Sequence, residues 1–319
     1  MPAFLDRYLN GDCAEVWADL VGLGDQVRQK SVLHDAEAVA DETMRRARQN
    51  LETLIPRLAA VGYRFAAPAL ERRLEKVNKI IAEPKLNSYV RRQLERAVEK
   101  GTAPASVLDP ATNKAVQMDL ATKRKEKSAL EAELERMRAM PPLENPRVFY
   151  PPDGQTNDPP EEQTTTYLNV MEKMARGPIP LSLRAWYKHV GHVSFMGAHE
   201  VLNPEGSAVA DPIVINSVYE LSKSLVIGQQ GDKIVLPVCL DDCRKADVPS
   251  GRPLGSPVQY KITIPNPSAD WLLENEWHET HFVQYLRKTF QWAGFPGWER
   301  DPNPPREMVS KLAEGLLPL

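Results

Sequence analysis

Residues 179–197, "IPLSLRAWYKHVGHVSFMG", mark the point where a sequence pattern typical of helices changes to one typical of strands. Pro180 suits the first turn of a helix, because its fixed φ angle matches the helical backbone. Trp186 and a neighbouring side chain are expected to bury against a sheet. Gly191 lets the chain turn with a positive φ angle that other residues resist. The segment therefore predicts a helix, a glycine turn and then a strand.

The residues after this segment predict a small sheet and a closing helix. Their apolar runs have strand length and several are rich in β-branched residues. The spacing between runs is too short for crossover helices, so the sheet should be largely antiparallel. Helical spacing returns at 280–295, where Thr280 is the expected N-cap, and the layout is α+β. The runs are 193–197, 211–216, 233–240, 258–265 and 271–275.

These motifs resemble the SUKH superfamily, which includes a fungal glucan-synthesis regulator and many bacterial toxin-immunity proteins. The likeness covers roughly residues 163–297, and it implies a SUKH-like domain that acts by binding other proteins. One departure is His192, which stands where the family usually has the second glycine of a Gly-Gly turn. The residues that carry the likeness are Ile179, Pro180, Leu183, Trp186, Tyr187, Gly191, Val193, Phe195 and Gly197.

The first 140 residues lie outside this resemblance and read as helical hairpins. The expected helices are 35–62, 67–84, 87–101 and 119–140, with Gly62 ending the first. The last helix is polar, so it should pair with a neighbour or with a second copy of the chain. Residues 141–160 contain seven prolines, which resist helix and central strand. We expect a helical region at 1–140, a proline-rich linker or strap at 141–162 and a SUKH-like domain at 163–319.

Charge argues against wholesale nucleic-acid binding, because the net charge is only -3. Residues 71–138 nevertheless hold sixteen Lys and Arg against eleven Asp and Glu. A solvated helical surface is the favoured interpretation of this excess. Nucleic-acid binding through a basic helical arm stays open as an alternative.

The histidines raise the main enzymatic alternative. Five of the six lie between 189 and 281. His278 and His281, in "HETH", resemble half of a zinc-protease motif, but they are three apart where that motif needs four. No phosphate-binding loop or serine-nucleophile elbow occurs. We therefore expect no catalytic, cofactor or metal residues, and keep a metal-dependent hydrolase that uses the late histidines as the rival hypothesis.

The remaining features favour a cytoplasmic protein. The three cysteines imply no disulfide framework, the N-terminus does not resemble a signal peptide, and no apolar run is long enough for a membrane helix. Trp277 and Trp298 belong to a late aromatic cluster and are the candidates for partner binding. The sequence thus predicts a non-enzymatic protein-binding module, immunity-type or regulatory and scaffolding, with a protein partner such as a cognate toxin.

Overall fold

The computed structural model divides the chain into two compact units, Met1–Ala66 with Pro141–Leu319, and Ala67–Met140. The boundary expected at residue 140 does not coincide with these units, since the first 66 residues belong with the C-terminal half. The expected helix at 87–101 and the proline-rich segment at 141–160 lie outside the described residues. Those are 3–65, 74–75, 77–81, 110–139, 161–204, 207–225, 228–240, 245 and 259–319.

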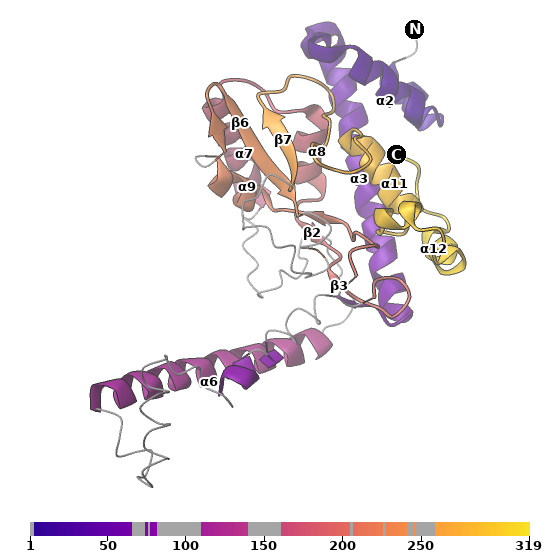
Figure 1. The fold of residues 1–319 in the computed structure, drawn as a ribbon. Coiled ribbons are helices and arrows are strands. Elements are labelled where there is room, and N and C mark those ends of the chain that lie inside the picture. The colour runs from indigo at the N-terminus through magenta and orange to yellow at the C-terminus, as the bar shows by residue number, and fades with distance from the viewer. Residues whose placement is uncertain are drawn as a thin grey trace. The chain divides into compact units, whose positions relative to one another are not determined.

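The long helix α3, Lys30–Ala60, carries much of the first unit (Figure 1). Its buried stripe packs against α8 (Leu181–His189), α1 (Phe4–Leu9) and α12 (Arg306–Ala313). It ends as predicted at Gly62, which has φ 89°. The Gly62 N–H donates to Ala59 O (3.0 Å) and the Tyr63 N–H to Leu58 O (2.9 Å). This pair of bonds is a Schellman motif, which satisfies carbonyls that the helix end leaves unpaired.

The expected α+β layout is confirmed, but the strands form three small antiparallel sheets. They pair in the orders β1-β3, β2-β4 and β5-β6-β7 among the described residues. The run at 193–197 gives two short strands in different sheets, and 271–275 forms only isolated bridges. The strands are β1 Arg64–Phe65, β2 Val193–Ser194, β3 Gly197–Ala198, β4 Val214–Ile215, β5 Gln229–Gln230, β6 Lys233–Cys239 and β7 Tyr260–Ile264.

The remaining helices surround these strands. In β6 and β7, Ile234 faces Ile264 and Leu236 faces Ile262, and all four side chains are buried. Buried and half-buried residues alternate along most of both strands, as expected of a sheet with one face more deeply covered. The other helical segments of the first unit are α2 Cys13–Gly22, η1 Gly24–Arg28, α7 Glu161–Ala175, α9 Val218–Ser224, α11 Phe282–Gln291 and η3 Pro296–Arg300. In the second unit, α6 spans Pro110–Ala139.

The segment at 179–197 turns as expected but packs differently. Gly191 has φ 87° and its carbonyl accepts a hydrogen bond from Trp186 Nε1 (2.7 Å). Trp186 is fully buried, and its ring meets Phe282 of α11 edge-on at a centroid distance of 5.4 Å. The Tyr187 hydroxyl donates to Asn216 O (2.8 Å). The two aromatic residues thus join α8 both to the closing helix and to the end of β4.

Gly197 shows why the N-terminal residues belong to this unit. A Cβ atom at Gly197 would lie 2.4 Å from Arg64 O of β1, so only glycine allows β1 to pair with β3. The Tyr63 hydroxyl also donates to Phe195 O (2.5 Å). Two residues of the resemblance motif, Phe195 and Gly197, therefore contact the N-terminal segment as well as the C-terminal half, where the Phe195 N–H donates to Ile213 O (2.8 Å).

The closing helix α11 is capped by a distant carboxylate and not by Thr280. The N-cap residue is His281, whose side chain makes no capping bond. Asp270 accepts instead, from the Val283 N–H (2.9 Å) and from the Ser182 hydroxyl of α8 (2.7 Å). Burial raises the pKa of Asp270, and the hydrogen bonds that it accepts oppose that shift. Asp270 thus ties α8 to the start of α11.

Among the described residues, none of the helices is both long and apolar enough to cross a membrane.

Candidate protein-binding groove

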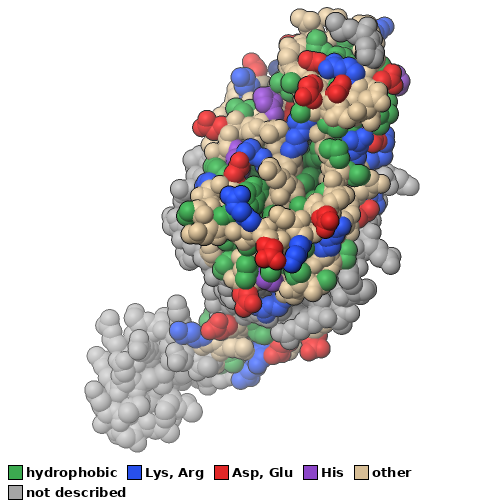
Figure 2. Space-filling view, turned by 90° about the vertical axis from the view of Figure 1, so that its right-hand side faces the viewer, with side chains coloured by type: hydrophobic (Ala, Val, Ile, Leu, Met, Phe, Trp, Pro, Cys, Tyr) green, Lys and Arg blue, Asp and Glu red, His purple; other side chains and the backbone are tan. Residues whose placement is uncertain are grey.

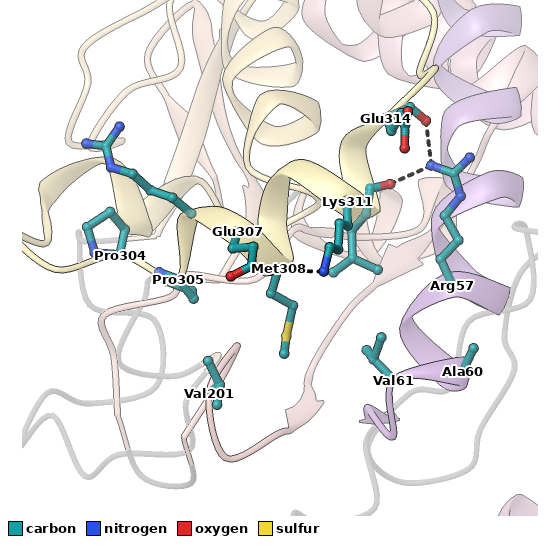
Figure 3. Close-up of a pocket in the computed structure, with 12 residues that line it drawn as sticks. Arg57, Ala60, Val61, Val201, Pro304, Pro305, Glu307, Met308, Lys311 and Glu314 are labelled. Atoms are coloured by element: carbon teal, nitrogen blue, oxygen red, sulfur yellow. Dashed lines mark hydrogen bonds and ion pairs between the residues drawn. The ribbon is translucent and has the colours of Figure 1, made fainter.

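A surface groove of about 980 Å³ lies between α12, the C-terminal end of α3 and the loop that carries Val201 (Figure 3). Three parts of the chain that are far apart in sequence therefore build it. Most of its apolar lining comes from α12 and from the two prolines before it. The apolar lining residues are Ala60, Val61, Val201, Pro304, Pro305, Met308 and Leu312.

The floor of the groove exposes apolar side chains to solvent. Val61 is 39% exposed and Val201 is 41% exposed. Met308 points from α12 into the space between them (Figure 3). Contiguous apolar surface of this kind marks interaction sites, and methionine adapts its shape to what binds. The floor can therefore receive an apolar segment.

His199 holds the two valines in place. Its Nε2 lies 3.0 Å from Val61 O, and its Nδ1 lies 3.1 Å from the backbone nitrogens of both Val201 and Leu202. Backbone N–H groups only donate, so Nδ1 must accept and the proton must sit on Nε2. The neutral ring then donates to Val61 O, at the end of α3. The sequence singled out His199 only as a member of the histidine group, whereas here it joins a helix end to a loop.

Trp298, expected on an exposed binding patch, is only 7% exposed. Its Nε1 donates to Leu202 O (2.8 Å), directly behind the loop that carries Val201. A Cβ atom at Gly297 would lie 2.0 Å from Val209 O, so η3 packs tightly on the neighbouring backbone. Trp298 therefore supports the wall of the groove from inside. The sequence predicted an exposed Trp298, whereas the structure buries its side chain beneath the groove wall.

Arg57 fixes α12 as the opposite wall (Figure 3). Its Nη1 donates to Leu312 O (2.7 Å) and to Glu314 O (2.6 Å). These carbonyls lie at the C-terminal end of α12, where unpaired oxygens and the helix dipole favour a cation. Lys311 and Glu307 pair across the exposed face of α12 (3.0 Å), and such a pair adds little stability. On the face shown in Figure 2, acidic and basic side chains are interspersed with apolar ones.

Trp277, the other candidate for partner binding, is half-buried in a different cluster. The Arg300 guanidinium lies 3.8 Å above its ring, and the His278 ring centroid lies 3.4 Å away. The His278 Nδ1 lies 2.6 Å from Glu276 and its Nε2 lies 2.5 Å from Glu299. Burial raises the pKa of Glu299, but hydrogen bonds from Lys288 and His278 outweigh this effect and lower it. The Trp277 ring thus contacts two side chains of its own chain, Arg300 and His278.

The late histidines do not form a metal centre in the described part of the chain. His281 begins α11, while both ring nitrogens of His278 are directed at carboxylates. Across the described ranges, no group of three or more His, Cys, Asp or Glu side chains is placed to hold a metal ion. The hydrolase hypothesis accordingly gains no geometric support from these residues.

Seven of the sixteen Lys and Arg residues of the basic arm lie in α6 of the second unit. Lys123 pairs with Glu126 (2.9 Å) and Lys127 with Glu131 (3.6 Å) along the helix. Pairs at these spacings are typical of a solvated helix surface. Nucleic-acid binding through this arm stays a prediction.

Comparison with known proteins adds no relative. No protein-family model matches the chain, and no significant match was found among curated proteins or solved structures. The arguments for function therefore rest on the groove and on the sequence motifs.

Proposed function

We propose that this chain is a non-enzymatic protein-binding module that receives an apolar segment of a partner protein in the groove beside α12. The observation that carries the proposal is the exposed floor, where Val61 and Val201 flank Met308 in a space of about 980 Å³. Pockets lined mainly by apolar side chains are the usual sites of recognition. The resemblance to the SUKH superfamily supports the same class, because its members act chiefly by binding proteins.

Rigid support around the floor favours binding over an incidental apolar patch. His199 joins Val61 to the loop, Trp298 holds that loop from behind, and Arg57 fixes the end of α12. Surfaces held in the binding geometry lose little conformational entropy when a partner docks. An immunity-type role, with a cognate toxin as partner, and a regulatory or scaffolding role both use such a surface.

Photo-crosslinking from position 201 of the full chain tests this proposal in cells of its source. The matched control places the same crosslinker at Val170, a valine on α7 that is also 41% exposed but does not line the groove. We expect one protein to crosslink from position 201 and not from 170. With that protein purified, Val201→Asp should weaken binding about tenfold or more, because the contact loses apolar burial and gains a desolvated charge.

Val170→Asp should leave the affinity unchanged. Equal crosslinking from both positions, or an affinity insensitive to Val201→Asp, would remove the groove as the binding site.

A further inference from the structure

The segment that follows α12 is held through its backbone. The Asn50 side chain of α3 pairs with both backbone groups of Leu317, donating to its carbonyl (2.9 Å) and accepting from its N–H (2.7 Å). Arg46 of α3 donates to Pro318 O (3.1 Å), and Arg287 of α11 donates to Leu319 O (2.7 Å). A side-chain amide that pairs with both groups of one residue imitates a neighbouring strand, the mode by which proteins bind extended peptides.

Apolar contacts of this segment occur at two positions three residues apart. Leu319 is only 4% exposed and joins the main core, and Leu316 is half-buried against it. Leu317 and Pro318 between them face solvent. Recognition thus consists of two leucine anchors with backbone pairing in between, which leaves the intervening side chains free to vary.

The side chains that bond to this segment come from two helices, α3 and α11, and leaving them without it is costly. Asn50 is buried, so water cannot easily replace the hydrogen bonds that its amide makes to Leu317. An unpaired amide at this position would cost free energy. Arg287 also donates to Cys13 O at the start of α2 (2.8 Å). Burial lowers the pKa of Arg287, and nearby Tyr8 and Cys13 partly oppose this. Arg287 donates as well to Gln284 Oε1 (3.2 Å), so its guanidinium bonds to three different oxygen atoms.

We infer that Arg46, Asn50 and Arg287 form a peptide-binding cleft that residues 315–319 fill in cis, and that an extended partner segment with leucine anchors three residues apart competes for it. None of these three residues lines the groove beside α12, so this is a second interaction site and stands independently of the proposed function. A tethered segment has an effective concentration in the millimolar range. A free competitor therefore binds well only when the cis segment is weakened or the competitor is locally concentrated.

Fluorescence anisotropy with the full chain and a labelled, end-capped peptide of sequence GLLPL tests this inference. In Leu319→Ala the cis segment loses its buried anchor, and we expect the peptide to bind at least tenfold more tightly than to the unaltered chain. Leu317→Ala is the matched control, because that leucine is solvent-facing, and it should leave peptide affinity unchanged. Adding Asn50→Ala to Leu319→Ala should abolish binding, and the peptide GSLPS, without anchors, should not bind.

Equal peptide affinity for Leu319→Ala and the unaltered chain, with both folded by circular dichroism, would overturn the inference. If Leu319→Ala unfolds the chain, Leu316→Ala supplies the weakened segment, and unchanged peptide affinity there counts against the inference equally. Val201→Asp should not alter peptide binding, so failure of this cleft and failure of the groove are distinguishable.

Discussion

The contact between α8 and the start of α11 at Asp270, called the joint below, differs from the groove beside α12. The joint buries polar groups, whereas the groove exposes apolar ones. In the joint, a buried carboxylate accepts bonds from Ser182 and Val283 and so ties two helices together. In the groove, Val61 and Val201 stay in solvent although their backbones are firmly held. The difference separates two roles: residues of the joint determine whether the chain folds, while residues of the groove are available for a partner. Substitutions should therefore affect stability at one and binding at the other.

The largest expected effect is at the joint. Asp270→Ala removes three accepted hydrogen bonds and leaves buried donors without partners, so we expect a loss of about 3 to 5 kcal/mol in the free energy of unfolding. Urea unfolding measures it. Asp232→Ala, at an exposed aspartate, is the control and should change stability by less than about 0.5 kcal/mol. A loss below about 1 kcal/mol at Asp270 would contradict the role assigned to the joint.

A second buried carboxylate, Asp211, tests whether buried polar contacts elsewhere in the chain are equally important for stability. Lys245 Nζ donates to Asp211 (2.7 Å), and both side chains are fully buried. Lys245→Met leaves the carboxylate buried without its cation, so we expect a loss of about 3 kcal/mol. The double variant with Asp211→Asn should recover part of that loss, since it removes the uncompensated charge. Additive losses in a double-mutant cycle would show that the two residues do not act as a pair.

Acid should lower the free energy of unfolding through His192. Burial lowers the pKa of its ring to about 4, and both ring nitrogens are shielded from water. In the unfolded chain the ring binds a proton near pH 6.5, so its contribution to stability is present above that pH and is lost as the pH falls toward 4. We expect a loss of about 2 kcal/mol across this window. His192→Gln should flatten the profile, and an unchanged slope would exclude His192 as its cause.

The smallest effect on stability is expected in the groove itself. Val201→Asp places a charge where the side chain already meets water, so the free energy of unfolding should change by less than about 0.5 kcal/mol. Thermal and urea unfolding measure it beside the partner affinity described above. A loss as large as that at Asp270 would show that the floor belongs to the core, and the contrast between the two regions would fail.

Local periodicity predicted the elements better than their partners. The spacing of apolar residues predicted α3, α8, β6, β7 and α11, and Gly62 and Gly191 have the positive φ angles that their positions require. Asp270 could not be recognised as a cap, because it lies 13 residues before Val283 and acts only through the fold. Thr280, adjacent to the helix, was the local expectation.

The groove could not be predicted for the same reason. Its walls come from the end of α3, the Val201 loop and α12, and no short-range pattern brings these together. Trp298 was found by its residue type alone, and its direction depends on the hydrogen bond to Leu202.

The order in which α3 and its covering helices appear along the chain has a consequence for biosynthesis. The helix is complete by residue 60, but α8, which covers it, begins only at Leu181. At translation rates of about 5 to 20 residues per second, its apolar stripe waits on the order of ten seconds for this partner. During that time residues 67–140, which belong to the second compact unit, are synthesised. The part of the stripe that α8 covers therefore stays uncovered until α8 is made, whereas α1, which is made first, can already pack against α3.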